Sequence, residues 1–231
     1  MFVSLSLLAS WLERRLGREK SINVLYRSSE RPVNRLVLAL EPGEIPADTD
    51  ADALFLHRPF ELSERFPGLG VLASHDPFDD LLTTNFNLTL ARALNWKNPR
   101  RLRLEERTVG TVADLESPLK WEALLETLEQ EFGGWEELLT PRELRLERLV
   151  LMSTFRPEAV RLAARVGAQV YLTGQMRPAG QTLALELGLG VVALGHRRSE
   201  LWGLNQLARE LSGAFPALEL NVMGSTLEPF A

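Results

Sequence analysis

The feature of this sequence that most restricts its fold is an internal repeat. Three short blocks occur in the same order in both halves of the chain, about 113 to 120 residues apart. RLVLAL from Arg35 resembles RLVLMS from Arg148, GLGVLASH from Gly68 resembles GLGVVALGH from Gly188, and LARAL from Leu90 resembles LAREL from Leu207. Chance explains any one of these matches, because short Leu and Val runs are common. Three in register indicate a duplicated unit.

Each repeat carries strand-like apolar runs that alternate with helical patterns. In the second half we expect strands over 145–153, 169–174 and 190–195 and helices over 157–167, 181–188 and 201–211. The first half is less regular, with strands expected near 23–26, 35–40, 53–56 and 70–73. Strands that alternate with helices predict a largely parallel sheet covered on both faces.

The predicted fold class is therefore α/β, with two similar α/β lobes whose mixed, largely parallel sheets are covered by helices. We place the first lobe at 1–115, a connecting helical segment at 116–147, and the second lobe at 148–231, closing over a shared cleft. In the connecting segment, one helical stripe is expected to serve as core or as a helix interface: Trp121, Leu124, Leu125, Leu128 and Phe132.

Composition narrows the classes of function. At 231 residues and 45% hydrophobic content the chain can bury a sizeable core. The absence of cysteine excludes disulfides and thiolate metal sites and fits a reducing compartment, so we expect a cytoplasmic protein. The net charge of −5 argues against a nucleic-acid surface. The one basic cluster, KNPRRLRLEER, is typical of a solvated strand.

The N-terminal stretch MFVSLSLLASWLERRLG resembles a signal peptide only briefly. It lacks a basic leader and a small-residue cleavage site. Leu5, Leu8, Leu12 and Leu16 recur at helical spacing, and Gly17 supplies a stop, so an amphipathic helix is expected. No segment approaches the roughly 18 apolar residues that suggest a membrane span, and we expect no association with a membrane.

All three histidines follow strand-like runs. ALFL precedes His57, GVLAS precedes His75 and VVALG precedes His196. In α/β sheets, ligands collect at the carboxyl ends of strands. If the two halves pack face to face, these histidines meet in one site between the lobes.

Two carboxylates accompany the histidines. Asp79 stands four residues beyond His75, and Glu200 stands four beyond His196 at the start of a helix. Imidazole and carboxylate together suit Zn, Fe, Mn, Co or Ni. Taken singly, each residue has a structural explanation, because a strand-end histidine often serves packing, Asp79 can cap a turn and Glu200 can complement a helix dipole. Taken together, they predict a metal site.

Several motifs resemble those of the NIF-three-like family, also described as GTP cyclohydrolase type-two-like or dinuclear metal centre hexameric proteins. The motifs are HRPF, HDPFDD with NLTLARAL downstream, VYLTGQ, and GHRRSELWGLNQLAREL, in family order between about Asn34 and Leu220. The resemblance implies two α/β lobes joined through a cleft, a toroidal homohexamer and a pair of divalent metals in the cleft. The chain resembles the short members, which lack a domain inserted between the lobes.

Carried over by position, the resemblance implies His57, Asp79, His196 and Glu200 as metal ligands. The family's second paired histidine is replaced by Arg58, which cannot ligate a metal because it keeps its proton. Relatives also commonly carry an acidic residue at Gln175 and a histidine in the loop that here holds Arg177 and Pro178. These departures suggest one well-bound metal or a weakly occupied pair, with Arg58 in place of an ion; the alternative is that Arg58 turns to solvent.

The function expected on these grounds is metal-dependent hydrolysis of a nucleotide or phosphoester. A divalent ion would activate water, His75 would act as general acid or base, and Arg58 would hold a substrate phosphate. The alternative is a metal-binding hexamer without catalysis, acting as a metal chaperone, a regulatory scaffold or a ring that contacts nucleic acid. The missing histidine favours this alternative.

Overall fold

A computed structural model describes residues 3–17 and 23–225. The chain forms two compact units. The first unit combines Met1–Asp79 with Gly203–Ala231, and the second is Asp80–Trp202. The first unit therefore draws on both ends of the chain, whereas the predicted lobes, 1–115 and 148–231, are continuous stretches.

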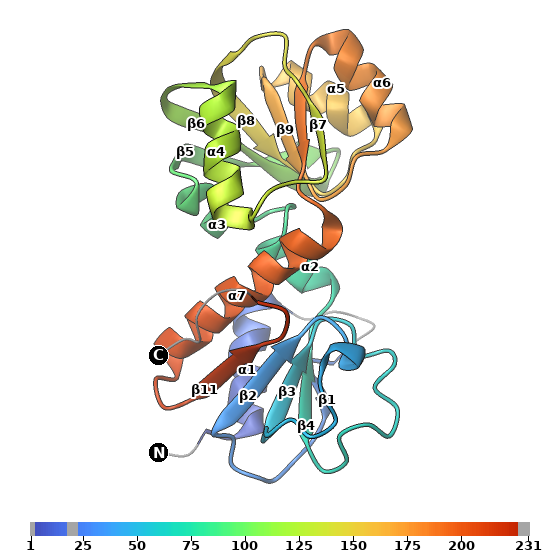
Figure 1. Ribbon diagram of the computed structural model, residues 1–231, viewed down its shortest axis with the longest axis vertical. Coiled ribbons are helices and arrows are strands. Elements are labelled where there is room, and N and C mark those ends of the chain that lie inside the picture. Colours follow the sequence, from blue (N-terminus) through green and yellow to red (C-terminus); the bar gives the residue numbers. More distant parts are fainter. Residues whose placement is uncertain (1–2, 18–22, 226–231) are drawn as a thin grey trace. The chain divides into compact units, whose positions relative to one another are not determined.

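The first unit is built on a five-stranded sheet in the order β1-β4-β3-β2-β11 (Figure 1). All neighbouring pairs are parallel except β1 with β4. The strands are β1 (Leu25–Arg27), β2 (Arg35–Ala39), β3 (Ala53–Leu56), β4 (Gly70–Ala73) and β11 (Glu219–Val222). The first four confirm the strands expected in the first half of the chain, while β11 was not foreseen.

Apolar runs explain why the centre of this sheet is buried. Every residue of β3 and β4 is buried, as central parallel strands require. On one face, α1 (Leu5–Leu16) buries the predicted leucine stripe and contacts β1 and β4. The helix begins where the Ser4 side chain accepts a hydrogen bond from the Leu7 amide, and Gly17 at φ +93° ends it. A short 3-10 helix, η1 (Pro42–Glu44), follows β2.

The second unit contains a six-stranded sheet in the order β5-β6-β8-β9-β10-β7. Only β8, β9 and β10 are parallel to one another, and the outer strands pair antiparallel. The strands are β5 (Trp96–Leu104), β6 (Arg107–Lys120), β7 (Glu137–Leu139), β8 (Arg145–Leu151), β9 (Val170–Thr173) and β10 (Gly190–Ala193). The basic segment expected to form a solvated strand is β5, at one edge.

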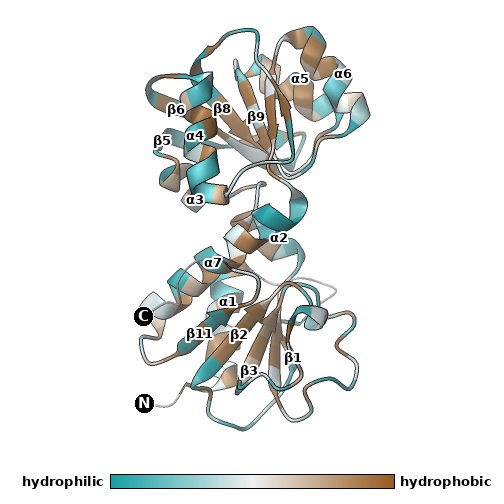
Figure 2. Ribbon diagram, in the orientation of Figure 1, coloured by the Kyte–Doolittle hydropathy of each residue, from teal (hydrophilic) through white to brown (hydrophobic). Residues whose placement is uncertain are grey.

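Helices cover both faces of this second sheet (Figures 1 and 2). One buried cluster joins residues of α3 (Leu88–Ala93) and α4 (Trp121–Phe132) to the sheet, and another joins α5 (Pro157–Arg165) and α6 (Pro178–Leu187) to its other face. Trp121, Leu124 and Leu128 are buried in the first cluster. The stripe on α4 is therefore core. The predicted α/β class, with mixed sheets covered by helices, is confirmed.

The two remaining helices, α2 (Asp76–Leu82) and α7 (His196–Ala214), contribute residues to both compact units. Two residues separate β4 from α2, and two residues separate β10 from α7. Among the described residues, no helix is long and apolar enough to cross a membrane.

Candidate metal centre

The candidate centre lies at the carboxyl ends of β3 and β4. These strands are parallel neighbours, and Leu56 pairs with Ala73 at their ends. His57 follows β3 at once, and His75 follows β4 after one residue. The register therefore brings two histidines together that are 18 positions apart in the sequence.

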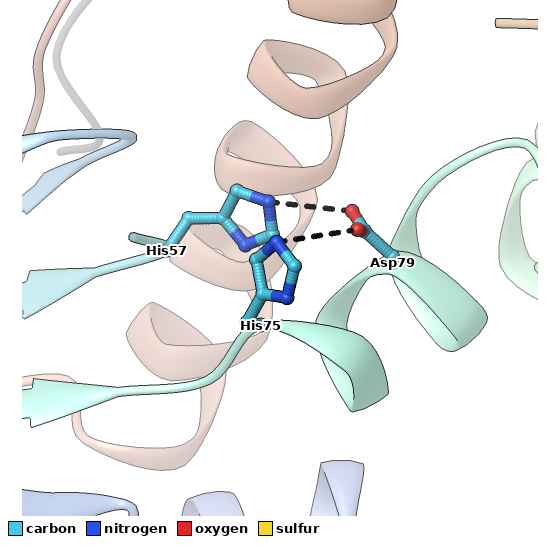
Figure 3. A group of neighbouring side chains, drawn as sticks. All are labelled: His57, His75 and Asp79. Atoms are coloured by element: carbon cyan, nitrogen blue, oxygen red, sulfur yellow. Dashed lines mark ion pairs between the residues drawn. The ribbon is translucent and has the colours of Figure 1, made fainter. Parts of the chain in front are cut away.

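Helix α2 adds a carboxylate to this pair. The Asp79 amide donates to the His75 carbonyl at 2.9 Å, which places Asp79 one helical turn beyond His75 on the same face. One carboxylate oxygen of Asp79 lies 3.3 Å from His57 Nε2, and the other lies 4.0 Å from His75 Nε2 (Figure 3). Each residue offers one atom that can bind a metal, and these three atoms lie within 4.8 Å of one another. Together, His57, His75 and Asp79 form a group that could bind a metal ion.

Hydrogen bonds fix the histidine that is most deeply buried. His57 Nδ1 lies 3.1 Å from the Ser74 carbonyl oxygen. A carbonyl only accepts, so Nδ1 must carry the proton, and a neutral ring then presents the lone pair of Nε2. His75 Nδ1 lies 2.9 Å from a carboxylate oxygen of Asp76 and is constrained in the same way. A carboxylate or backbone carbonyl on the second nitrogen is the usual support of metal-binding histidines.

This geometry fits a cation. Both Nε2 atoms face one carboxylate, at 3.3 and 4.0 Å from its oxygens, and a proton or a metal ion between a ring nitrogen and a carboxylate oxygen turns this contact into an attraction. Imidazole nitrogen and carboxylate oxygen are ligands for Zn, Fe, Mn, Co and Ni.

The group is closed on one side and open on the other. The His57 side chain is fully buried, with the buried ring of Phe78 at 4.7 Å and the ring of His75 stacked at 4.8 Å. The side chains of His75 and Asp79 retain 29% and 30% of their exposure. Solvent can therefore reach these two side chains, and a catalytic metal site likewise needs one position that water or substrate can reach.

Arg58, the residue after His57, pairs with a carboxylate. Its backbone amide donates to the Leu40 carbonyl at 2.8 Å, and its side-chain Nε donates to a carboxylate oxygen of Glu41 at 2.9 Å. The Arg58 side chain is 22% exposed and that of Glu41 is 51% exposed. The guanidinium is thus held by an ion pair and does not extend freely into solvent.

His196 and Glu200 form a separate pair in the second unit. They lie one turn apart at the start of α7, with His196 Nε2 2.9 Å from a Glu200 carboxylate oxygen. Gly195 adopts φ +97° just before the helix, and a side chain there would meet the Glu136 carboxylate. The pair and the three-residue group belong to different units. The four-residue ligand set of His57, Asp79, His196 and Glu200 therefore stays a prediction.

His75 was expected at this strand end as an acid or base and not among the metal ligands. Its Nε2 faces the same carboxylate as His57 Nε2, so it also belongs to the group that could bind a metal ion. The signal was present, because a histidine and an aspartate four residues apart at a helix start share a face. The strand register that adds His57 could not be read locally.

A separate hollow lies in the second unit, near the amino ends of β8, β9 and β10. Its volume is about 660 Å³, and its lining includes Asp114, Glu143, Arg148 and Gln169. These polar groups are engaged with one another: Arg148 pairs with Asp114 at 2.6 Å, and the Gln169 amide donates to Glu143 at 3.0 Å. No histidine lines this hollow. We therefore assign the chemistry to the group of His57, His75 and Asp79.

Comparison with known proteins agrees with the motifs. The model of the Duf34/NIF3 (NGG1p interacting factor 3) family matches residues 67–229, and the chain belongs to this family. It is 25% identical over 214 residues to a GTP cyclohydrolase 1 type 2 homolog of Allochromatium vinosum, covering 84% of each chain. The expected membership of the NIF-three-like family is confirmed.

Solved structures share the fold at low sequence identity. Reduced HcgD from Methanocaldococcus jannaschii matches with a TM-score of 0.74 and 20% identity, over 97% of this chain and 99% of that one. A Thermus thermophilus protein matches with a TM-score of 0.73 and 19% identity, over 97% and 99%. A Bacillus cereus protein related to NIF3 matches with a TM-score of 0.63 and 13% identity, over 98% and 97%. These likenesses establish the two-sheet fold.

Proposed function

We propose that the protein is a metal-dependent hydrolase that acts on a nucleotide or a phosphoester. One observation carries the proposal: the Nε2 atoms of His57 and His75 face the two oxygens of one carboxylate, Asp79, and each ring is oriented through its other nitrogen. The name of the Allochromatium vinosum relative, a GTP cyclohydrolase 1 type 2 homolog, supports a nucleotide as substrate.

The proposed cofactor is a divalent ion, Zn, Fe, Mn, Co or Ni, with one or two per chain. Such an ion supplies Lewis-acid chemistry and makes water a competent nucleophile near neutral pH. His57 and Asp79 would hold it, and we propose His196 and Glu200 as further members of the ligand set. The buried His57 ring cannot turn away, since Ser74 and Phe78 fix it.

The remaining roles fall to His75 and Arg58. His75 is partly exposed and carries a carboxylate partner on Nδ1, an arrangement suited to moving a proton at Nε2. Arg58 holds the substrate phosphate, since a guanidinium matches an oxyanion and Glu41 fixes its orientation. In this proposal, His75 at the end of β4 carries the proton and Arg58 at the end of β3 binds the substrate anion during hydrolysis.

The test begins with Asp79→Asn, which keeps the shape of the side chain and removes its charge. Metal affinity should fall by more than about 100-fold, because the loss of outer partners alone costs about 10- to 100-fold. Bound metal is measured by mass spectrometry after equilibrium dialysis, and hydrolysis is screened over nucleotides and phosphoesters with Mn, Zn, Fe and Co. Asp48→Asn, at an exposed carboxylate of the same unit, is the control.

His75→Gln separates two roles in the same assay. A proton carrier predicts lost turnover with bound metal retained, while a third ligand predicts that both are lost. Full turnover in Asp79→Asn without bound metal would falsify the proposed hydrolase.

A second function, metal binding without catalysis, is favoured by Arg58. It places a fixed positive charge where the family resemblance implies a second histidine, and that charge is held in place by Glu41. Such a protein would act as a metal chaperone or a regulatory scaffold. Stoichiometric, Asp79-dependent metal binding with no turnover of any nucleotide or phosphoester in the screen would select this function.

We extend the proposal to assembly and location. A homohexamer and a cytoplasmic location are expected from the family resemblance and from the lack of cysteine. Light scattering on the purified full chain should give about six chain masses. A monomer at micromolar concentration would contradict this part of the proposal and leave the metal assignment in place.

A further inference from the structure

An exposed aromatic ring stands beside the candidate metal centre. Phe60 is 65% exposed, the most of any large hydrophobic residue described. The Leu62 amide donates to the Pro59 carbonyl at 3.1 Å, so Phe60 and Glu61 occupy the corner of a tight turn. Turn corners usually carry small or polar residues. The ring centroid of Phe60 lies 5.9 Å from that of His75, at an interplanar angle of 68°.

The loop that carries Phe60 is anchored in the core. Leu62 and Phe66 are buried, at 3% and 8% exposure, and pack in one cluster with Ile45 on the face of the sheet formed by β2, β3 and β4. Ser63 and Phe66 both adopt left-handed backbone angles, φ +44° and φ +54°. Non-glycine residues hold such angles only where the surroundings impose them, and they cluster at ligand clamps.

Arginine side chains supply that restraint. Arg27 donates from Nε to the Leu69 carbonyl at 3.1 Å and from its terminal nitrogen to the carbonyls of Arg65 and Phe66 at 3.1 and 3.0 Å. Arg65 in turn donates to the Ile45 carbonyl at 3.0 Å. These bonds fix the segment that follows the turn, and the buried Leu62 joins the turn to it.

We infer that Phe60 is a stacking platform that selects ligands with a planar aromatic ring at this centre, and specifically the base of a nucleotide. The inference rests on the proposed function and names its substrate class. The phosphate would meet Arg58 and the metal group, and the base would lie on the exposed face of Phe60. A rigid aromatic ring binds a base at little cost in conformational entropy, and such stacking tolerates different bases.

The surroundings of Phe60 argue against a docking surface for another protein. Its neighbours Glu61, Glu64 and Arg65 are exposed and charged. An apolar interface needs a contiguous patch with few charges at its centre. A single exposed ring that is flanked by charged residues and contacts the imidazole of His75 fits a small ligand.

The test compares two ligands that differ only by the base. Guanosine 5′-monophosphate and ribose 5-phosphate are titrated calorimetrically into the metal-loaded full chain, and into Phe60→Ala, Phe60→Leu and Phe60→Tyr. We expect the nucleotide to bind more tightly than the sugar phosphate. Phe60→Ala should weaken only the nucleotide, by roughly 5- to 100-fold. Phe60→Tyr should retain affinity because it keeps the ring, whereas Phe60→Leu, which keeps only the apolar character, should not.

Leu185→Ala removes an exposed leucine of the second unit and serves as the control for lost apolar surface, with no change expected. Equal affinity of the two ligands for the unmodified protein, including no binding of either, overturns the inference. The inference also fails if Phe60→Ala lowers the affinity for both ligands by the same factor. It fails as well if Phe60→Ala changes the mass of the assembly and leaves both affinities unchanged. Metal content is measured on the same samples, so that failure of the stacking inference can be told from failure of the hydrolase proposal. The hydrolase proposal is tested by Asp79→Asn, and the stacking inference is tested by Phe60→Ala.

Discussion

The two units place a histidine and a carboxylate at the carboxyl ends of parallel strands, but they bury opposite partners. In the first unit the His57 side chain has no exposure and that of Asp79 has 30%. In the second, His196 is 66% exposed and Glu200 only 1%. The repeat aligns His196 with His75, not with His57, so the two pairs are not equivalent by sequence, and they differ in which partner is buried. The buried partner is the imidazole of His57 in the first unit and the carboxylate of Glu200 in the second.

This contrast predicts that His57 supports the fold more than His196 does. His57→Ala should lower the free energy of unfolding by about 2–4 kcal/mol, because it opens a cavity against Phe78 and leaves the Ser74 carbonyl without the ring's hydrogen bond. His196→Ala should cost about 1 kcal/mol or less, since water can replace a ring that is two-thirds exposed. Urea unfolding with chelator present measures both. Equal losses would show that the two pairs are alike after all.

A second comparison uses the glycines that begin β4 and β10, which are equivalent in the repeat. A side chain at Gly190 would lie 2.8 Å from the buried ring of Pro141, whereas one at Gly70 would meet the tips of Leu5, at 2.4 Å. A proline ring cannot move aside, while a leucine can change rotamer. Gly190→Ala should cost about 1–3 kcal/mol and Gly70→Ala less. The same urea assay decides, and the reverse order would contradict this account of the packing.

The smallest expected effect concerns the Arg58–Glu41 pair. Both side chains keep some exposure, 22% and 51%, so Glu41→Gln should change stability by less than about 1 kcal/mol. Metal content should stay unchanged. Weaker binding of ribose 5-phosphate would sharpen the role of Arg58, because Glu41 orients the guanidinium. A loss of metal in this variant would instead place the ion pair inside the metal site.

Much of the fold was predictable because burial leaves a local signature. ALFL and GVLA must lie within a sheet, and the leucines of α1 and the stripe on α4 repeat at helical spacing. The β5–β6 hairpin was harder, since its strands are charged on their exposed sides and Asn98 adopts φ +47° at an irregularity in the pairing. β11 has four residues and gains its identity only by pairing with β2.

The candidate site divides in the same way. The residue types and their positions after apolar runs were legible in the sequence, and so was the one-turn spacing of His75 and Asp79. His75 was expected as an acid or base, and its place in the group that could bind a metal ion was not predicted. Its neighbour His57 is 18 positions away, and only the register of β3 on β4 brings the rings to 4.8 Å.

By itself, the sequence determined which segments must be buried as strands and helices and which polar residues must lie at their ends, because hydrophobic burial acts on each segment through its own side chains. The tertiary structure alone decided which strand ends are neighbours, which polar partner each imidazole nitrogen meets, and that the last strand joins the first sheet. Those outcomes depend on hydrogen bonds between backbones far apart in the chain, and no local pattern of residues specifies such partners.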